Sequence, residues 1–231
     1  MKYTLLNDLI NLFYPDLCIA CKLPLLRNES HLCLHCILGL PITNFHLIEE
    51  NKIHRLFTGR IPAKNATAYL HFIKNGIVQS ILHQLKYQDK PALGVYLGKI
   101  AGKDLKRQGF FHQIDYIIPI PLHPKKLKTR KYNQAEKIAL GLSMASKLDL
   151  ENNLLIRSTH NETQTRKSRF NRWLNVESIF EIGNVPIHKF KSKHILIVDD
   201  VLTTGSTIEA AAVVLMEKLN VKISIFTLAI A

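Results

Sequence analysis

The segment HILIVDDVLTTGST (residues 194–207) decides the fold of this chain. Its four leading apolar residues after the histidine predict a buried strand, with Asp199 and Asp200 at the carboxyl end. A turn rich in hydroxyl groups follows and opens a long apolar helix. The residues of this turn are Thr203, Thr204, Gly205, Ser206 and Thr207. A buried strand that turns directly into a helix is typical of α/β proteins.

The turn at residues 203–207 has the composition of a phosphate-binding site. Backbone N–H groups converge where a helix begins, and the positive end of the helix dipole favours an anion there. Gly205 lets the backbone approach the ligand, and the neighbouring hydroxyls supply further donors. The alternative is an ordinary strand–turn–helix unit with Ser/Thr capping.

The two carboxylates argue against that alternative, because adjacent acids at the end of a buried strand are costly without a function. Asp199 and Asp200 can accept hydrogen bonds from vicinal sugar hydroxyls or approach a hydrated Mg²⁺. A diol acceptor beside a phosphate site describes a pocket for ribose 5-phosphate.

Strand and helix patterns alternate from about residue 66 to the end of the chain. The candidate strands are Ala66–Tyr69, Tyr116–Ile120, Leu154–Ile156, Ser178–Glu181, His194–Val198 and Ile223–Leu228. The candidate helices are Gly76–Tyr87, Leu93–Gln108, Asn133–Lys147 and Ser206–Leu219. This order predicts an α/β fold with a mostly parallel sheet that helices cover on both faces. Ligands of such sheets bind at the carboxyl ends of strands, where the two acids stand.

Residues 1–60 are less regular and predict a separate unit: an N-terminal helix, a small four-cysteine module and a connector, with the α/β domain over residues 61–231. Apolar residues in positions 5–13 recur at helical spacing. They form a face that packs on the core or contacts a membrane. No run of about 18 apolar residues exists, so the sequence predicts no membrane span. Polar residues also interrupt the N-terminal stretch, which favours a cytoplasmic protein over an exported one.

Four cysteines lie in two pairs, Cys18–Cys21 and Cys33–Cys36, with eleven residues between the pairs. Each pair can place two thiolates on one side of a tight turn, and two such turns give four sulfurs for tetrahedral zinc. Two disulfides or four free thiols are the alternatives, but a chain without an export signal favours zinc. Since four sulfurs close the coordination sphere, the predicted zinc site is structural.

The charge is strongly positive, because 31 lysines and arginines exceed 18 acidic residues and leave a net charge of +13. This excess predicts a polyanionic partner such as nucleic acid, a nucleotide phosphate or an anionic membrane, or else it reflects a generally basic proteome. The 47% hydrophobic content excludes a disordered chain.

The segment VDDVLTTGST resembles the phosphoribosyl-pyrophosphate (PRPP) loop of type I phosphoribosyltransferases. The final strand and three further segments resemble the ComF family of competence-associated proteins, which also carries an N-terminal cysteine zinc module. These segments are LKYQDKPALGVYLGK (85–99), DYIIPIPLHPKKLKTRKYNQAEKIA (115–139) and TQTRKSRFNRWLNVESIFEI (163–182). The resemblance covers nearly the whole chain in the family's order.

This resemblance implies that Asp199 and Asp200 bind the ribose hydroxyls and that Thr203 to Thr207 bind the 5′-phosphate. It implies a role in natural transformation, with incoming single-stranded DNA and proteins of the DNA-uptake machinery as partners. A second hypothesis is an active phosphoribosyltransferase, in which PRPP binds with Mg²⁺ and a nitrogen nucleophile attacks C1. The sequence identifies no acceptor for that reaction.

The strand at residues 116–120 runs into a proline-rich loop and five basic residues within positions 125–131. In the phosphoribosyltransferase fold this loop resembles a pyrophosphate loop. We expect backbone amides near Leu122 and His123, with Lys125 or Lys126, to face the diphosphate; the alternative is a solvated basic turn. Lys86 is a weaker candidate for the same end of the ligand. The family usually has glycine where this chain has Lys131.

Residues 158–177 have no clear period and carry many basic groups. Arg166, Arg169 and Arg172 recur every three residues and form one stripe if the segment is helical. Three hypotheses remain open for this stripe. It covers the pyrophosphate of PRPP, or it follows a nucleic-acid backbone while Trp173 or Phe170 stacks on bases, or it is a solvated loop.

Overall fold

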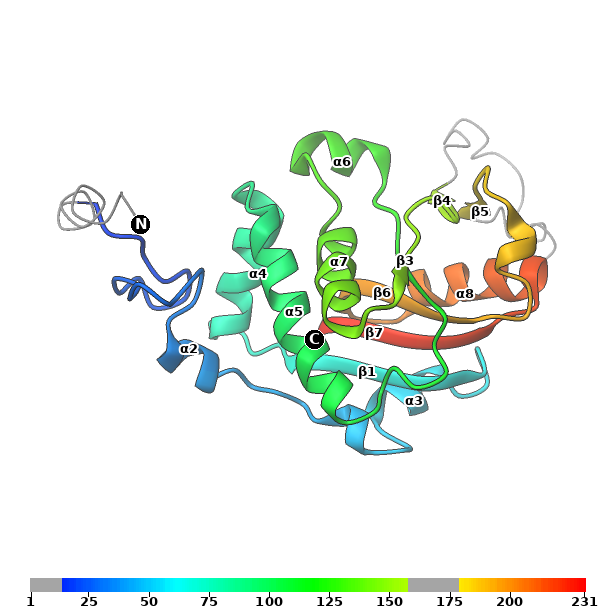
Figure 1. Cartoon of the computed structure of the whole chain (residues 1–231), viewed down its shortest axis with the longest axis horizontal. Coiled ribbons are helices and arrows are strands. Elements are labelled where there is room, and N and C mark those ends of the chain that lie inside the picture. The colour runs from blue at the N-terminus through cyan, green and yellow to red at the C-terminus, as the bar shows by residue number, and fades with distance from the viewer. Residues whose placement is uncertain (1–13, 158–178) are drawn as a thin grey trace, which may run out of the picture.

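A five-stranded sheet forms the centre of the protein in a computed structural model that describes residues 14–157 and 179–231 (Figure 1). The strands are β1 (Ala63–His71), β2 (Tyr116–Pro119), β3 (Asp149–Leu150), β6 (His194–Leu202) and β7 (Lys222–Ile230). Their order is β1-β7-β6-β2-β3, and each neighbouring pair is parallel. The predicted parallel α/β sheet is therefore confirmed.

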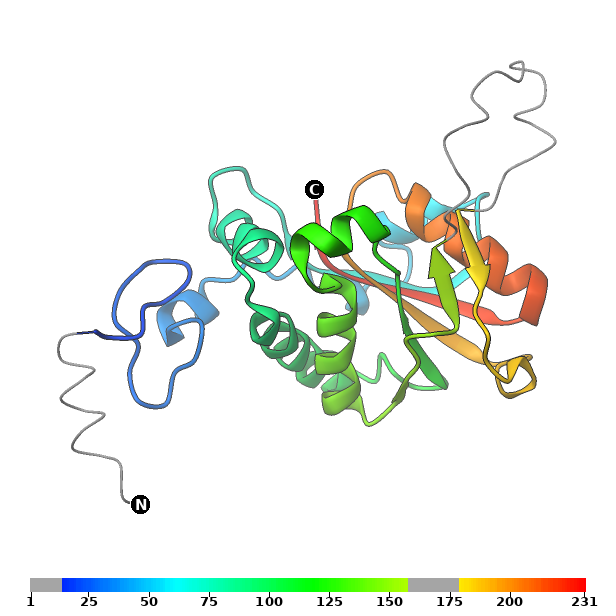
Figure 2. The same cartoon turned by 90° about the horizontal axis from the view of Figure 1, so that it is seen from above.

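Helices cover both faces of this sheet (Figure 2). One face carries α4 (Ile77–Tyr87), α5 (Pro91–Arg107) and α7 (Gln134–Ser146), and the other carries α3 (Lys52–Phe57) and α8 (Ser206–Leu219). The alternation of apolar side chains along β6 explains this arrangement. Leu196 and Val198 belong to the first core and Ile195 and Ile197 to the second, because successive side chains of a strand point to opposite faces.

Strand β6 is longer than the sequence predicts. It continues to Leu202, so Asp199 and Asp200 lie inside its last part instead of following it. Strand pairing explains the extension, because β7 continues alongside β6 as far as the last residue of β6. Asp199 pairs with Thr227 and Leu202 pairs with Ile230.

Two predicted strands lie outside the parallel sheet, which corrects the expectation that they belong to it. β4 (Leu155–Arg157) and β5 (Phe180–Ile182) form a separate antiparallel pair. Antiparallel strands can pair without a crossover helix between them, whereas parallel strands need one. The two paired strands lie on either side of the segment at residues 158–178 in the sequence.

The four predicted helices are confirmed within a few residues at their ends. Short helices escaped sequence analysis: α2 (Leu34–Leu38), α3, α6 (Pro124–Arg130) and the 3₁₀ turns η1 (Phe45–Leu47) and η4 (Ile187–Lys189). They are too short for a hydrophobic period to reveal. The predicted N-terminal helix lies outside the described residues.

The cysteine module packs beside α4 and α5 (Figure 1). Its buried residues Ile19 and Leu32 share one apolar core with these helices, and the His31 ring meets the Tyr96 ring edge-on at 5.3 Å. The connector packs elsewhere, since α3 shares the second core with α8. The division of the chain at residue 60 stays a prediction. No helix in the described part of the chain is long and apolar enough to cross a bilayer.

Candidate functional site

The strand order reverses between β2 and β6, and this switch point positions the candidate site. After β2 the chain passes through α6 and α7 to β3 on one side, whereas after β6 it passes through α8 to β7 on the other. Such reversals leave a crevice at the carboxyl ends of the strands, where ligands bind. A cavity of about 200 Å³ lies here. It is lined by Lys86, Ile120, Pro121, Leu122, Lys126, Arg130, Asn133, Gln134, Ala135, Arg157, Asp199, Asp200, Val201 and Thr207.

The adjacent acids Asp199 and Asp200 both line the cavity, as the sequence predicts. Strand alternation directs them to opposite sides of β6. Asp200 pairs with Lys86 of α4, with 3.1 Å between Oδ2 and Nζ. The backbone N–H of Asp200 donates to Oδ1 of Asp199 at 2.8 Å, so the two residues form one polar unit.

Burial and the neighbouring Asp200 charge raise the pKa of Asp199 to about 7, although Lys86 and Arg157 oppose this shift. Near neutral pH Asp199 therefore exchanges between an acid and a carboxylate. The carboxylate accepts hydrogen bonds from sugar hydroxyls, whereas the acid can donate one. An approaching cation favours the carboxylate.

Four basic side chains face the two acids in the cavity lining. They are Lys86, Lys126, Arg130 and Arg157. Their excess of positive charge suits a ligand with several anionic groups. Sequence analysis missed the last two of these residues. Arg157 lies half-buried on β4, where its guanidinium stacks over the Phe180 ring at 5.3 Å. Burial lowers its pKa from the ordinary arginine value, and the nearby Asp199 charge acts in the opposite direction.

Asn133 also escaped sequence analysis as a site residue. Its side-chain Nδ2 donates to the carbonyl of Ile120 at 2.9 Å, and its Oδ1 accepts the N–H of Ala135 at 3.1 Å. The same side chain thus caps α7 and fixes the chain just beyond β2. Gln134, the next residue, accepts a hydrogen bond from Arg130 Nη1 at 3.0 Å. The asparagine before a helical pattern is the one signal that sequence analysis had for this position.

The hydroxyl-rich turn joins β6 to α8, as predicted. Thr207 lines the cavity, whereas Thr203, Thr204 and Ser206 are exposed next to it along the chain. The hydroxyls of Thr204 and Ser206 lie 3.1 Å apart. Gly205 caps α8 in the left-handed conformation with φ of 78°.

The loop after β2 brings only part of its predicted residues to the cavity. Leu122 and Lys126 line it, but His123 and Lys125 are not among the lining residues. Instead, His123 caps α6, because its Nδ1 accepts the backbone N–H of Lys125 at 3.2 Å. Lys131 ends α6 with φ of 66°, the left-handed conformation that explains a family preference for glycine there.

The arginine stripe predicted at Arg166, Arg169 and Arg172, and Trp173 beside it, lie outside the described residues. Arg157, the residue before that segment, lines the cavity. The antiparallel pairing of Arg157 with Phe180 brings both sides of the segment to one place.

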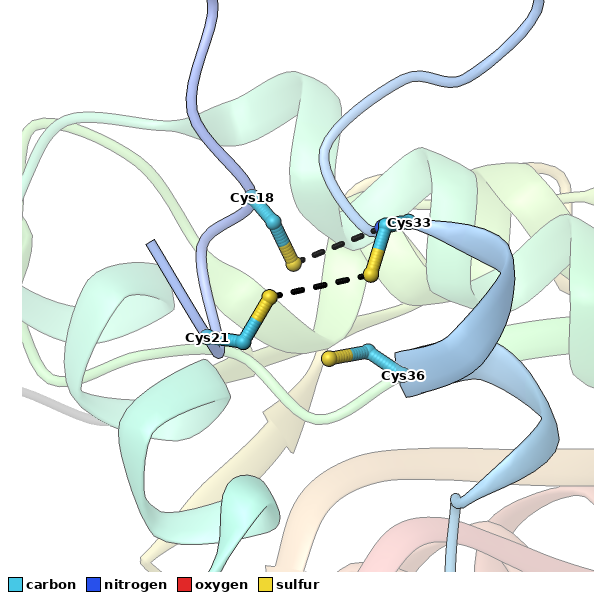
Figure 3. Close-up of side chains that lie close together, drawn as sticks. All are labelled: Cys18, Cys21, Cys33 and Cys36. Carbon is cyan, nitrogen blue, oxygen red and sulfur yellow. Dashed lines mark hydrogen bonds between the residues drawn. The ribbon is translucent and has the colours of Figure 1, made fainter. Parts of the chain in front are cut away.

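The four cysteines form a second candidate site, on the module beside α4 and α5 (Figure 3). Their sulfur atoms all lie within 4.8 Å of one another, and those of Cys21 and Cys33 are 3.7 Å apart. Tetrahedral zinc with Zn–S bonds of about 2.3 Å needs sulfurs about 3.8 Å apart, so this set can hold a metal ion such as zinc. No disulfide joins the four cysteines.

Hydrogen bonds prepare one of these sulfurs for the thiolate form. Burial raises the pKa of Cys18, but backbone N–H groups of Cys21, Cys33 and Ala20 outweigh it and bring the pKa down to about 6. The N–H of Cys33 donates to Cys18 Sγ at 3.4 Å. A thiolate held by backbone N–H groups is typical of a cysteine metal knuckle.

Known proteins match most of the chain. A family model described as a phosphoribosyl transferase domain matches residues 141–231. Competence protein F of Haemophilus influenzae is 31% identical over 145 residues, which make up 62% of each chain. Competence protein ComFC of Bacillus subtilis is 27% identical over 212 residues, which cover 90% of this chain and 81% of that protein.

These matches support a ComF-family protein with a phosphoribosyltransferase-like domain. A third relative, the DNA utilization protein YhgH of Escherichia coli K12, is 25% identical over 87% of this chain and 91% of its own length. The first relative is matched over less than two thirds of its length. The matched phosphoribosyl transferase region contains β6, the acid pair and the turn at residues 203–207.

Two solved structures illustrate the similarity of the fold. One is described as the allosteric regulatory enzyme of purine biosynthesis, with a TM-score of 0.41 and 18% identity over 62% of this chain and 29% of that chain. Another is adenine phosphoribosyltransferase from Leishmania tarentolae, with a TM-score of 0.35 and 13% identity over 79% of this chain and 88% of that one.

Proposed function

We propose that this ComF protein binds PRPP with Mg²⁺ in the cavity between β2 and β6 and acts in natural transformation, where it handles incoming single-stranded DNA in the cytoplasm. The observation that carries the ligand proposal is the acid pair at the end of β6. Two carboxylates face four basic side chains, and a helix begins beside them. This combination suits a sugar whose hydroxyls and phosphates need opposite kinds of partner.

The ligand has one orientation that satisfies each group. The turn at residues 203–207 receives the 5′-phosphate, and Asp199 and Asp200 receive the ribose hydroxyls and the hydrated Mg²⁺. The diphosphate then faces the loop after β2 and Lys126. Lys86, which pairs with Asp200 in the free protein, lies where it can exchange that carboxylate for a phosphate oxygen.

The DNA proposal rests on charge and on the relatives. The net charge is +13, and α6 with its C-cap carries Lys125, Lys126, Lys128, Arg130 and Lys131, of which Lys126 and Arg130 line the cavity. Cations that neutralise DNA phosphates give affinity that is independent of base sequence and falls with salt. Two relatives are named competence proteins and another a DNA utilization protein. Proteins of the DNA-uptake machinery are the proposed protein partners.

An active phosphoribosyltransferase is the second candidate function, and the basic cavity favours it. Cations around the diphosphate would stabilise the charge that develops on departing pyrophosphate. The acids would orient the ribose for attack at C1 by a nitrogen nucleophile. This reaction needs no covalent intermediate with the protein, so the acid pair and the basic groups suffice on the protein side.

Calorimetry with PRPP and Mg²⁺ tests the ligand proposal. We expect the wild-type protein to release or absorb measurable heat, and Asp200→Asn to bind at least about tenfold more weakly, because charge-assisted hydrogen bonds contribute about 1.5–3 kcal/mol. Asp104→Asn is the matched control, since Asp104 lies on α5 and pairs with Arg107 outside the cavity. No heat with the wild type, or equal affinity in Asp200→Asn, contradicts the proposal.

Two further assays separate the DNA function from turnover. Single-stranded DNA should bind at low salt and dissociate as salt rises, and this binding should survive Asp200→Asn if DNA uses a separate surface. Failure to bind at low salt would reject the DNA function. Pyrophosphate release that depends on an added nitrogen acceptor would instead establish the transferase function.

A further inference from the structure

Arg60 links the connector to the turn that begins α8. It follows α3, and its Nη1 donates to the backbone carbonyl of Thr204 at 2.9 Å. Its Nε donates to Oε2 of Glu209 at 3.0 Å, and Nη2 forms an ion pair with the same oxygen. These partners lie 144 and 149 residues away in the sequence, so no local motif indicates the contact.

Phe57 completes this contact from the end of α3. Its ring is fully buried and lies against Gly205, where an added Cβ atom would come within 2.8 Å of the ring. The Arg60 guanidinium stands over the same ring, 5.6 Å from its centroid. The backbone N–H of Arg60 also donates to the backbone carbonyl of Phe57 at 2.9 Å. The ring and the guanidinium thus support the turn together.

The hydrogen bond to Thr204 fixes the direction of a peptide group. In a trans peptide the carbonyl of one residue and the N–H of the next point in opposite directions. Because the Thr204 carbonyl points to Arg60, the N–H of Gly205 points away from Arg60. The outward N–H groups of such a turn are the donors that an anion needs.

The ion pair removes an unfavourable charge from the same place. Glu209 lies in the first turn of α8, and its carboxylate there would repel a phosphate at the start of the helix. Arg60 neutralises this carboxylate, and both side chains are only about one third exposed, which limits screening by solvent.

We propose that Arg60 is a positioning residue for the 5′-phosphate end of the ligand. It orients the peptide between Thr204 and Gly205 and neutralises Glu209, so that the turn at residues 203–207 accepts a phosphate. This inference rests on the proposed PRPP site and extends it. It makes the connector a supporting part of a site whose other residues come from the α/β domain.

The test compares two probes that occupy opposite ends of the site: ribose 5-phosphate, and inorganic pyrophosphate with Mg²⁺. We expect Arg60→Ala to weaken ribose 5-phosphate at least tenfold and to change pyrophosphate less than twofold. Arg60→Lys should keep part of the affinity, because lysine retains the charge but not the fixed geometry of the guanidinium. Arg55→Ala is the control, since Arg55 is an exposed residue of α3, the helix that precedes Arg60.

A second variant separates the two roles of Arg60. Adding Glu209→Gln to Arg60→Ala removes the unpaired carboxylate, and ribose 5-phosphate affinity should recover in part. Thermal melting of each variant checks that it is folded. If Arg60→Ala does not fold, Arg60→Lys and the single variant Glu209→Gln are used in its place.

Two results would overturn this inference while leaving PRPP binding intact. One is an Arg60→Ala protein that binds ribose 5-phosphate like the wild type, and the other is an equal loss for both probes, which indicates a general structural role. A wild-type protein that binds neither probe and no PRPP would reject the proposed function and this inference with it.

Discussion

At the scale of single residues, Asp199 combines burial with a second carboxylate at its side. Its backbone neighbour Asp200 finds a partner in Lys86, whereas Asp199 has a pKa raised to about 7. A carboxyl group whose pKa is higher in the folded than in the unfolded protein favours folding while it is protonated. The site therefore keeps a group that is costly for the free protein, as functional sites often do.

Asp199→Asn should reveal this cost in the free protein. The contribution of Asp199 to stability is fully present below pH 4 and is lost as the pH rises through about 7. As the pH rises over this range, the free energy of unfolding of the variant should therefore increase relative to that of the wild type. The difference should change by on the order of 2–4 kcal/mol once Asp199 of the wild type is fully ionised. Urea unfolding of both proteins from pH 4 to pH 8 measures it, and parallel curves would contradict the predicted shift.

Gly205→Ala should destabilise the protein for two independent reasons. The residue has φ of 78°, which costs a non-glycine residue about 1–2 kcal/mol, and the new methyl group would press on the Phe57 ring at 2.8 Å. We expect a loss of about 2–4 kcal/mol in the free energy of unfolding. Gly59→Ala is a useful control, because that glycine has a similar φ of 77° but open space around it. Equal losses in both variants would contradict the packing contribution.

At the scale of elements, α5 and α7 approach each other closely and so place the start of α7 at the cavity. A Cβ atom at Gly98 would lie 2.2 Å from the Ile138 carbonyl oxygen, and one at Gly141 would lie 2.2 Å from that of Val95. Both contacts are with backbone atoms, which cannot rotate away. The pair of helices therefore depends on glycine at the crossing.

Gly98→Ala should push α5 and α7 apart. The expected loss in the free energy of unfolding is about 1–3 kcal/mol, despite the better helix propensity of alanine. Chemical denaturation measures the loss, with Lys103→Ala on the exposed side of α5 as a control that should change by less than about 0.5 kcal/mol. A Gly98→Ala protein as stable as the control would show that the helices adjust without cost.

Elements with long apolar periods were predictable from the sequence, and elements set by distant partners were not. The parallel sheet and its four main helices follow from alternation of strand and helix patterns. The end of β6 depends on β7, and the pairing of β4 with β5 depends on residues more than twenty positions apart. Neither dependence is visible in a local window.

The residues of the candidate site also divide into those that a local motif reveals and those that distant elements contribute. Asp199, Asp200 and Thr207 belong to one continuous motif, so sequence analysis found them. Arg157 and Arg60 reach the site from other elements without a motif of their own. Conversely, His123 fits a local basic pattern, but it caps α6 instead of lining the cavity.

At the scale of the whole molecule, the cysteine module shares one apolar core with α4 and α5. Cys18, Cys33 and Cys36 are buried in the core that also contains α4 and α5 residues. The module is too small to hold its own shape by apolar burial, so a structural metal would stabilise it and its contact with α4. Lys86 stands near the end of that helix, at the candidate site.

Metal analysis of the purified protein should find about one zinc ion per chain. Cys33→Ser should lower both the zinc content and the melting temperature, because a lost ligand opens the site and loosens the shared core. His35→Ala is the control, since His35 is exposed in the same module and should retain zinc. A metal-free wild-type protein with an unchanged melting temperature after chelator treatment would contradict structural zinc.

A crystal structure with PRPP and Mg²⁺ would test whether this ligand binds between β2 and β6. We predict ribose density at Asp199 and Asp200, with the 5′-phosphate against the N–H groups of residues 203–207. Density for the ligand elsewhere, or a 5′-phosphate on the α6 side with the diphosphate at the start of α8, would contradict it.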